Sequence, residues 1–149
     1  MKTFKEYLIE TLKGYVPYKW LYIREDMAKA TFDINGLTYY VFISEDDPVD
    51  DPHIWDVVFQ LADPPPGLGL YDITGTKNAF TVFATVMNII QEFVSKRSDD
   101  IRAITFTAKE PSRQRLYDRL AKMLIQSLPN HWKLFIKQRG VRKYYIVHD

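Results

Sequence analysis

The spacing of apolar residues changes between the two halves of the chain and predicts different elements in each. In the first half, runs that alternate between apolar and polar residues predict strands over residues 18–25, 27–34 and 37–44. The more continuous apolar run of residues 53–62 predicts a central strand, which would have no face in water. Asn35-Gly36 separates two of the alternating runs and is typical of a two-residue type I′ hairpin turn.

The second half changes to the helical period. Apolar residues at helical spacing predict helices over residues 78–95 and 112–128. An alternating strand over residues 101–108 is expected between them. A closing hairpin over residues 132–147, turning at residues 138–141, completes the chain.

A short amphipathic helix is also predicted over residues 3–13, because Thr3 and Glu6 form a capping-box pair and Gly14 follows. The predicted order is a helix, four strands in a meander, then a helix, a strand, a helix and two strands. This order predicts an α+β fold, with a mixed, mostly antiparallel sheet of about six to seven strands and helices on its faces. We expect residues 1–14 to be an N-terminal helix or leader, and residues 15–149 to form a single domain.

Composition excludes several classes of protein. The 149 residues are 46% hydrophobic, 15% aromatic and 26% charged, which suits one domain with a substantial core. The absence of cysteine excludes disulfides, thiolate zinc sites and cysteine nucleophiles. No apolar run approaches the roughly 20 residues that cross a bilayer. We therefore expect a soluble, cytoplasmic protein with no membrane partner.

Charge is divided unevenly along the chain. The formal net charge is +1, but residues 1–95 carry −7 and residues 96–149 carry +8. A basic half of this kind indicates an anionic ligand, a nucleic acid or an acidic partner. Two oppositely charged surfaces that face water, or each other, would give the same distribution.

The start of the helix near residue 78 is a candidate phosphate site. Gly75, Thr76, Lys77 and Asn78 would present unpaired backbone N–H groups, a cation and a hydroxyl at the positive end of a helix dipole. The alternative is an ordinary N-cap made by Thr74 or Thr76.

A second candidate lies where the strand ending at residue 108 turns into the next helix. Tyr117 follows Leu116, so it can lie at the edge of the apolar face with its hydroxyl free to donate a proton. Arg113, in the first turn of the helix, could assist in binding a phosphate. The alternative for Tyr117 is a half-buried ring that serves only packing.

The order of elements and these two motifs resemble the GNAT acyltransferases. In that family the turn into the main helix has the pattern R/Q-x-x-G-x-G/A, and the segment from Arg115 to Leu120 resembles the family's Leu-Tyr-x-x-Leu-Gly-Phe helix. The resemblance implies a GNAT-like fold and transfer of an acyl group from acetyl-CoA, or another acyl-CoA, to an amine acceptor. The backbone of residues 75–78 would then bind the coenzyme pyrophosphate, and Tyr117 would protonate the leaving thiolate. Asp56 and Glu45 are the candidate bases.

The chain departs from the family pattern at several positions. Asp72 replaces the basic or amide residue that begins the turn motif, and Lys77 occupies the place of a small residue. Ala121-Lys122 replaces Gly-Phe, and Glu110 takes the place of an asparagine. Because the coenzyme site needs close backbone approach, these changes bear on activity more than on the fold.

The N-terminus carries a second resemblance. Residues 1–10 are similar to the capsid-targeting leaders of internal head proteins in large tailed bacteriophages, and Leu8-Ile9-Glu10 resembles the Leu-x-Glu cleavage site of their proteases. This resemblance implies a small phage protein and offers an alternative function. The chain could be a non-enzymatic virion or host-interaction protein that keeps the fold, with a phage head or host protein as its partner.

A third hypothesis is a basic surface that binds nucleic acid. Basic side chains interleaved with aromatic ones suit phosphate contacts and base stacking. They lie on the second long helix and in the closing hairpin: Arg113, Arg115, Arg119, Lys122, Lys137, Arg139, Arg142, Lys143, Tyr144 and Tyr145. The helix residues would equally form a solvated polar face. His131 and His148 have no carboxylate at metal-ligand spacing, so no metal is expected.

Overall fold

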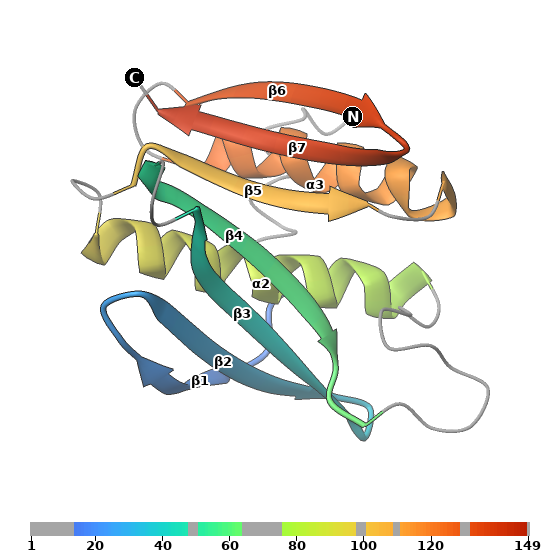
Figure 1. Ribbon diagram of the computed structural model, residues 1–149. Coiled ribbons are helices and arrows are strands. Elements are labelled where there is room, and N and C mark those ends of the chain that lie inside the picture. The colour runs from blue at the N-terminus through green and yellow to red at the C-terminus, as the bar shows by residue number, and fades with distance from the viewer. Residues whose placement is uncertain are drawn as a thin grey trace. The chain divides into compact units, whose positions relative to one another are not determined.

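The computed structural model describes residues 14–47, 51–63, 76–97, 101–108, 111–128 and 132–148 (Figure 1). Within these ranges the chain forms seven strands and two helices. In chain order they are β1 (Tyr18–Ile23), β2 (Met27–Ile34), β3 (Leu37–Asp47), β4 (Asp51–Leu61), α2 (Thr76–Lys96), β5 (Ala103–Ala108), α3 (Pro111–Ser127), β6 (Trp132–Arg139) and β7 (Val141–His148). The predicted leader and its helix over residues 3–13 lie outside the described residues.

The strands form one sheet in the order β1-β2-β3-β4-β5-β7-β6. β1 pairs with β2, β5 with β7 and β6 with β7 in antiparallel fashion, whereas β4 pairs with β5 in parallel. The sheet is therefore mixed and mostly antiparallel, which confirms the predicted α+β class. β4 takes the predicted central position, but only one of its faces is fully buried, because Ile54, Asp56, Val58 and Gln60 on the other face are half-exposed.

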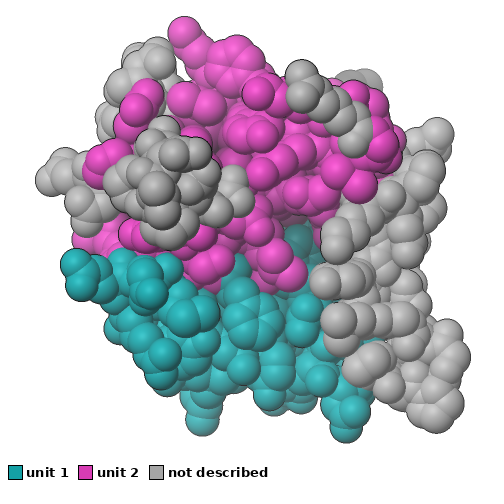
Figure 2. Space-filling model, in the orientation of Figure 1, with its two compact units in different colours: residues 1–42, 59–93 teal, residues 43–58, 94–149 magenta. Residues whose placement is uncertain are grey.

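The chain divides into two compact units (Figure 2). Unit 1 comprises residues 1–42 and 59–93, and unit 2 comprises residues 43–58 and 94–149. The boundaries fall inside β3, β4 and α2 and not in a linker.

The core of unit 1 includes every second residue of β2. Ala28, Ala30, Phe32 and Ile34 are buried, with at most 7% exposure. Tyr39 of β3 stacks on Phe32, with ring centres 5.3 Å apart. The apolar stripe of α2 contributes to the same core, where Phe83 meets Phe59 of β4 edge-on. One face of each strand is therefore buried together with one stripe of the helix.

Trp20 of β1 contacts two residues of α2 within unit 1. The indole N–H of Trp20 donates a hydrogen bond to the Glu92 carboxylate, and the Trp20 ring lies 6.4 Å from that of Phe93. Burial raises the pKa of Tyr18 to about 12, with a further contribution from the negative charge of Glu92. β1 is thus held to the helix by polar contacts as well as by packing.

The β2–β3 hairpin turns as the sequence predicts. Asn35 and Gly36 have φ angles of 51° and 80°, the left-handed values that a type I′ turn requires at both central positions. Beside the turn, the Thr38 hydroxyl donates a hydrogen bond of 2.5 Å to Asp33 Oδ1. The strand boundary differs from the prediction, because β3 continues to Asp47, beyond the expected end at residue 44.

Candidate functional site

The parallel pair of β4 and β5 is the centre of unit 2. Its ladder joins Ile54 to Ala103, Trp55 to Ile104 and Asp56 to Thr105. At its last pair the buried Thr105 hydroxyl donates a hydrogen bond of 2.8 Å to Asp56 Oδ1. Both strands continue past this pair, but no further ladder pair joins their described residues. The two strands therefore stop pairing halfway along β5.

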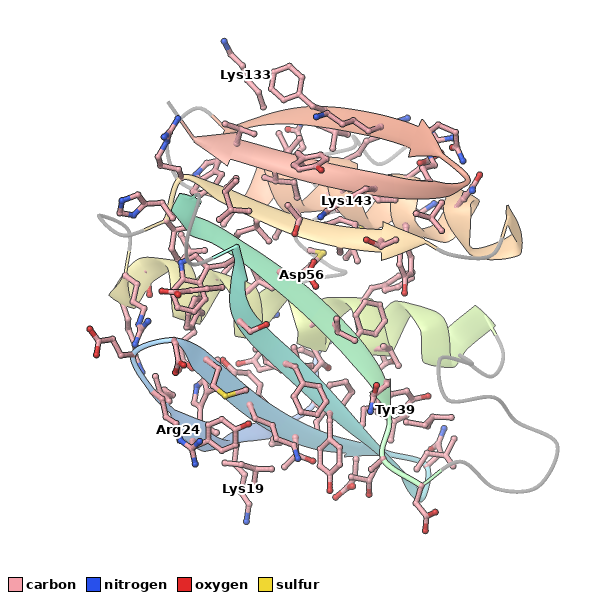
Figure 3. The ribbon with its side chains drawn as sticks, viewed as in Figure 1. Lys19, Arg24, Tyr39, Asp56, Lys133 and Lys143 are labelled. Atoms are coloured by element: carbon pink, nitrogen blue, oxygen red, sulfur yellow. The ribbon has the colours of Figure 1, made fainter. Side chains whose placement is uncertain are left out.

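Alternation along β5 and β7 separates unit 2 into two faces. Phe106 pairs with Tyr144, and both rings contact Tyr117 of α3, so we call this side the helix face. Thr105 pairs with Tyr145 on the opposite side, which we call the outer face. Asp56 pairs with Thr105 and shares its outer face (Figure 3).

Tyr117, the predicted proton donor, lies on the helix face. Its ring centre is 5.9 Å from that of Phe106 and 6.2 Å from that of Tyr144, and only 6% of the residue is exposed. The sequence predicts Tyr117 at the edge of the apolar face of α3, whereas the structure buries it among aromatic rings. Because Asp56 lies on the outer face, the structure does not bring this predicted acid and base together.

For the other predicted site residues, the structure gives mainly the element on which each one lies. Glu45 is half-buried in β3, where alternation puts it on the same side as the buried Ile43. Thr76, Lys77 and Asn78 form the first turn of α2, and Arg113 lies in the first turn of α3. Gly75 lies outside the described residues, and the side chains of these four helix residues are not described.

Sequence reasoning missed a polar network on the helix face. The Tyr144 hydroxyl lies 2.6 Å from Asp118 Oδ1 and 2.9 Å from the Gln114 carbonyl oxygen, and its single proton can serve one acceptor at a time. Arg142 Nε lies 3.1 Å from the same Asp118 oxygen, in an ion pair without hydrogen-bond alignment. Burial, the largest cause, and contact with Asp118 together raise the pKa of Tyr144 well above its usual range.

The basic residues and tyrosines of the closing hairpin divide between the two faces. Arg142 and Tyr144 lie on the helix face, whereas Lys137, Lys143 and Tyr145 lie on the outer face. Strand alternation over residues 141–148 was the signal that could have separated them, because neighbouring residues point to opposite sides. On α3, Arg119 and Lys122 are exposed, as a solvated polar face requires. The residues of the predicted basic surface therefore do not share one face of the hairpin.

The described residues contain neither a metal-ion cluster nor a membrane-spanning helix. No group of three or more His, Asp or Glu side chains among them could hold a metal ion. Neither of the two described helices is long and apolar enough to cross a membrane.

Comparison with known protein families gives a match to a family model. No curated protein and no solved structure matches the chain. A model of DUF6934, a family of unknown function, matches residues 40–146, a segment that contains the β4–β5 pair, α3 and nearly all of the β6–β7 hairpin. Because the match covers well over half of the 149 residues, the chain belongs to this family of unknown function.

Proposed function

We propose that the chain is an acyl-CoA-dependent N-acyltransferase with a GNAT-like fold. The observation that carries the proposal is the parallel β4–β5 pair, which the chain connects through α2 and whose ladder ends at Asp56 and Thr105. The resemblance to GNAT acyltransferases implies that the pantetheine arm of the coenzyme enters where two such strands part.

The end of the ladder gives this proposal a physical basis. Val57 and Val58 continue β4, but they have no ladder partner among the described residues of β5. Backbone N–H and C=O groups freed in this way need other partners. The amide groups of a pantetheine arm can supply them as an added strand does, through main-chain hydrogen bonds.

The proposed roles follow the family resemblance. Backbone N–H groups of Gly75, Thr76, Lys77 and Asn78 bind the coenzyme diphosphate, and Arg113 assists. The acceptor nitrogen, deprotonated by Glu45 because Asp56 lies on the face opposite Tyr117, attacks the thioester carbonyl carbon, and the carbon–sulfur bond then breaks. The leaving thiolate takes a proton from the Tyr117 hydroxyl.

A second candidate function is favoured by the position of Tyr117. A protein that keeps the fold without the chemistry has no need to bring an acid and a base to one face, and here Tyr117 and Asp56 lie on opposite faces. This candidate is a non-enzymatic phage protein that binds a virion or host component. Mass spectrometry of purified phage particles tests the virion version, which fails if the chain is absent from them.

Calorimetric titration with acetyl-CoA tests the first proposal. We expect saturable binding that is weakened by Lys77→Glu and unchanged by Lys122→Glu, a matched charge reversal at an exposed position of α3. No detectable heat at millimolar acetyl-CoA would overturn the proposal. Saturable binding without acyl transfer to a panel of primary amines would separate the coenzyme site from the chemistry and favour the non-enzymatic function.

A further inference from the structure

The outer face of the β6–β7 hairpin combines aromatic and basic side chains in a fixed register. Phe135 lies opposite Tyr145, and Lys137 lies opposite Lys143 in the next pair on the same face. Lys133 precedes Phe135 by two residues, so β6 presents a cation, an aromatic ring and a cation at intervals of roughly 6.8 Å. β6 is the last strand in the sheet order.

Two ammonium groups approach the ring of Tyr145. Lys137 Nζ lies 5.1 Å and Lys143 Nζ lies 5.4 Å from its ring centre. Like charges directly opposite each other weaken an antiparallel pair, and contact with the ring face offsets part of that cost. An anion bound beside Lys137 and Lys143 would remove the remaining repulsion. The hairpin is thus arranged to favour negative charge on this face.

The third element of this face is an exposed aromatic ring. Phe135 is 54% exposed, more than any other large hydrophobic residue described in unit 2. Asp56, an acidic side chain on the outer face, is separated from β6 by β5 and β7 and accepts the hydrogen bond of Thr105. Figure 3 shows Lys133 and Lys143, with Asp56 on another strand. The surface at β6 is therefore both cationic and aromatic.

We propose that this outer face binds single-stranded nucleic acid. Lys133, Lys137 and Lys143 contact phosphates, and Phe135 stacks on a base. Cations alone would fit any anion, whereas an exposed ring between cations offers the stacking platform that unpaired bases use. Arg142 and Tyr144 take no part, because they lie on the helix face. The proposal does not depend on acyl transfer, since Tyr117 lies on the helix face as well.

Fluorescence anisotropy of a labelled oligothymidylate of about 20 nucleotides tests the proposal with the full chain. We expect Lys137→Ala and Lys143→Ala each to weaken binding, and to reduce the slope of log K against log salt by about 0.7. Phe135→Leu should weaken binding about tenfold, and Phe135→Tyr should preserve it. Lys122→Ala on α3 is the matched control and should leave binding unchanged. Circular dichroism of each variant verifies folding.

Three outcomes would overturn the proposal. The first is a wild-type chain that gives no salt-dependent rise in anisotropy. The second is a folded Phe135→Leu variant that binds as tightly as wild type. The third is an equal loss of binding in Lys122→Ala and Lys137→Ala, which would show that total charge matters and this face does not.

Discussion

The hydroxyl of Thr105 donates a hydrogen bond of 2.8 Å to Oδ1 of Asp56 at the last residue pair of the β4–β5 ladder. Thr105 is fully buried and Asp56 is partly so. A hydrogen bond to a carboxylate contributes more to stability than one between neutral groups, and burial of the donor shields it from water. This contact secures the point at which the two parallel strands part.

Replacing Thr105 by valine should therefore destabilise the chain. Valine keeps the shape of threonine but removes the donor, and we expect the free energy of unfolding to fall by about 2 kcal/mol. Urea denaturation gives this value, and Thr105→Ser, which retains the hydroxyl, is the matched control. A Thr105→Val variant as stable as the wild-type chain would show that the hydrogen bond contributes nothing.

The network of Tyr144, Asp118 and Gln114 supports a second prediction. Tyr144→Phe removes the hydroxyl that lies close to both acceptors and leaves them in a half-buried site, so stability should fall by about 1 kcal/mol. Tyr145→Phe makes the same chemical change one residue away on the outer face and should cost less than half as much. Thermal unfolding of the two variants side by side measures the difference, and equal losses would contradict the prediction.

Tyr18 should titrate late in alkaline solution. Its pKa is raised to about 12, first by burial and then by the charge of Glu92. The absorbance of tyrosinate in wild type, compared with Tyr18→Phe, isolates this group among the ten tyrosines. Glu92→Gln removes the nearby negative charge that helps to raise the pKa of Tyr18. The pKa should therefore fall but stay above 10, because burial remains. A Tyr18 that titrates near 10 in wild type would contradict the structure.

The same shift has a consequence for stability. Between pH 10, where tyrosine ionises in the unfolded chain, and about 12, the folded state binds more protons at Tyr18 than the unfolded state does. The contribution of Tyr18 to stability is therefore complete below pH 10 and is lost as pH rises through 12. Denaturation curves at several alkaline pH values should show a shallower decline for Tyr18→Phe than for wild type.

The β2–β3 turn gives a prediction that depends on backbone conformation alone. A Cβ added at Gly36 would meet no atom within 4 Å, so an alanine there suffers only from the φ of +80°. We expect Gly36→Ala to lower stability by about 1 kcal/mol and Gly36→Asn, which tolerates this conformation, to lower it less. Urea denaturation of both variants checks the order, and an alanine variant as stable as the asparagine variant would contradict it.

Local signals in the sequence predicted much of the fold. Asn35-Gly36 specified a turn because few other pairs accept two positive φ angles, and the apolar character of residues 53–62 predicted a central strand. Alternation predicts a strand that ends at residue 44, yet β3 continues through acidic residues to Asp47. The length of a strand depends on its hydrogen-bonded neighbours, and the polarity of its own side chains does not reveal them.

The candidate site was harder to predict because it depends on register between distant segments. Tyr117 could be assigned to the helix near the coenzyme motif, but its burial depends on Phe106 and Tyr144, which only the order of β5 and β7 brings to it. The sequence predicts Arg142 on a nucleic-acid surface, whereas its partner Asp118 lies 24 positions away in the chain. The sequence pattern of one segment does not show which distant segment its residues contact.

The division into two units has a consequence for the smallest piece of this protein that can fold. The chain passes between the units within β3, within β4 and near the end of α2, so neither unit can be released by a single cut. A fragment limited to residues 40–146, the extent of the family match, would lack β1, β2 and both rings of the Phe32–Tyr39 stack. We therefore expect the smallest fragment that folds to extend beyond residues 40–146.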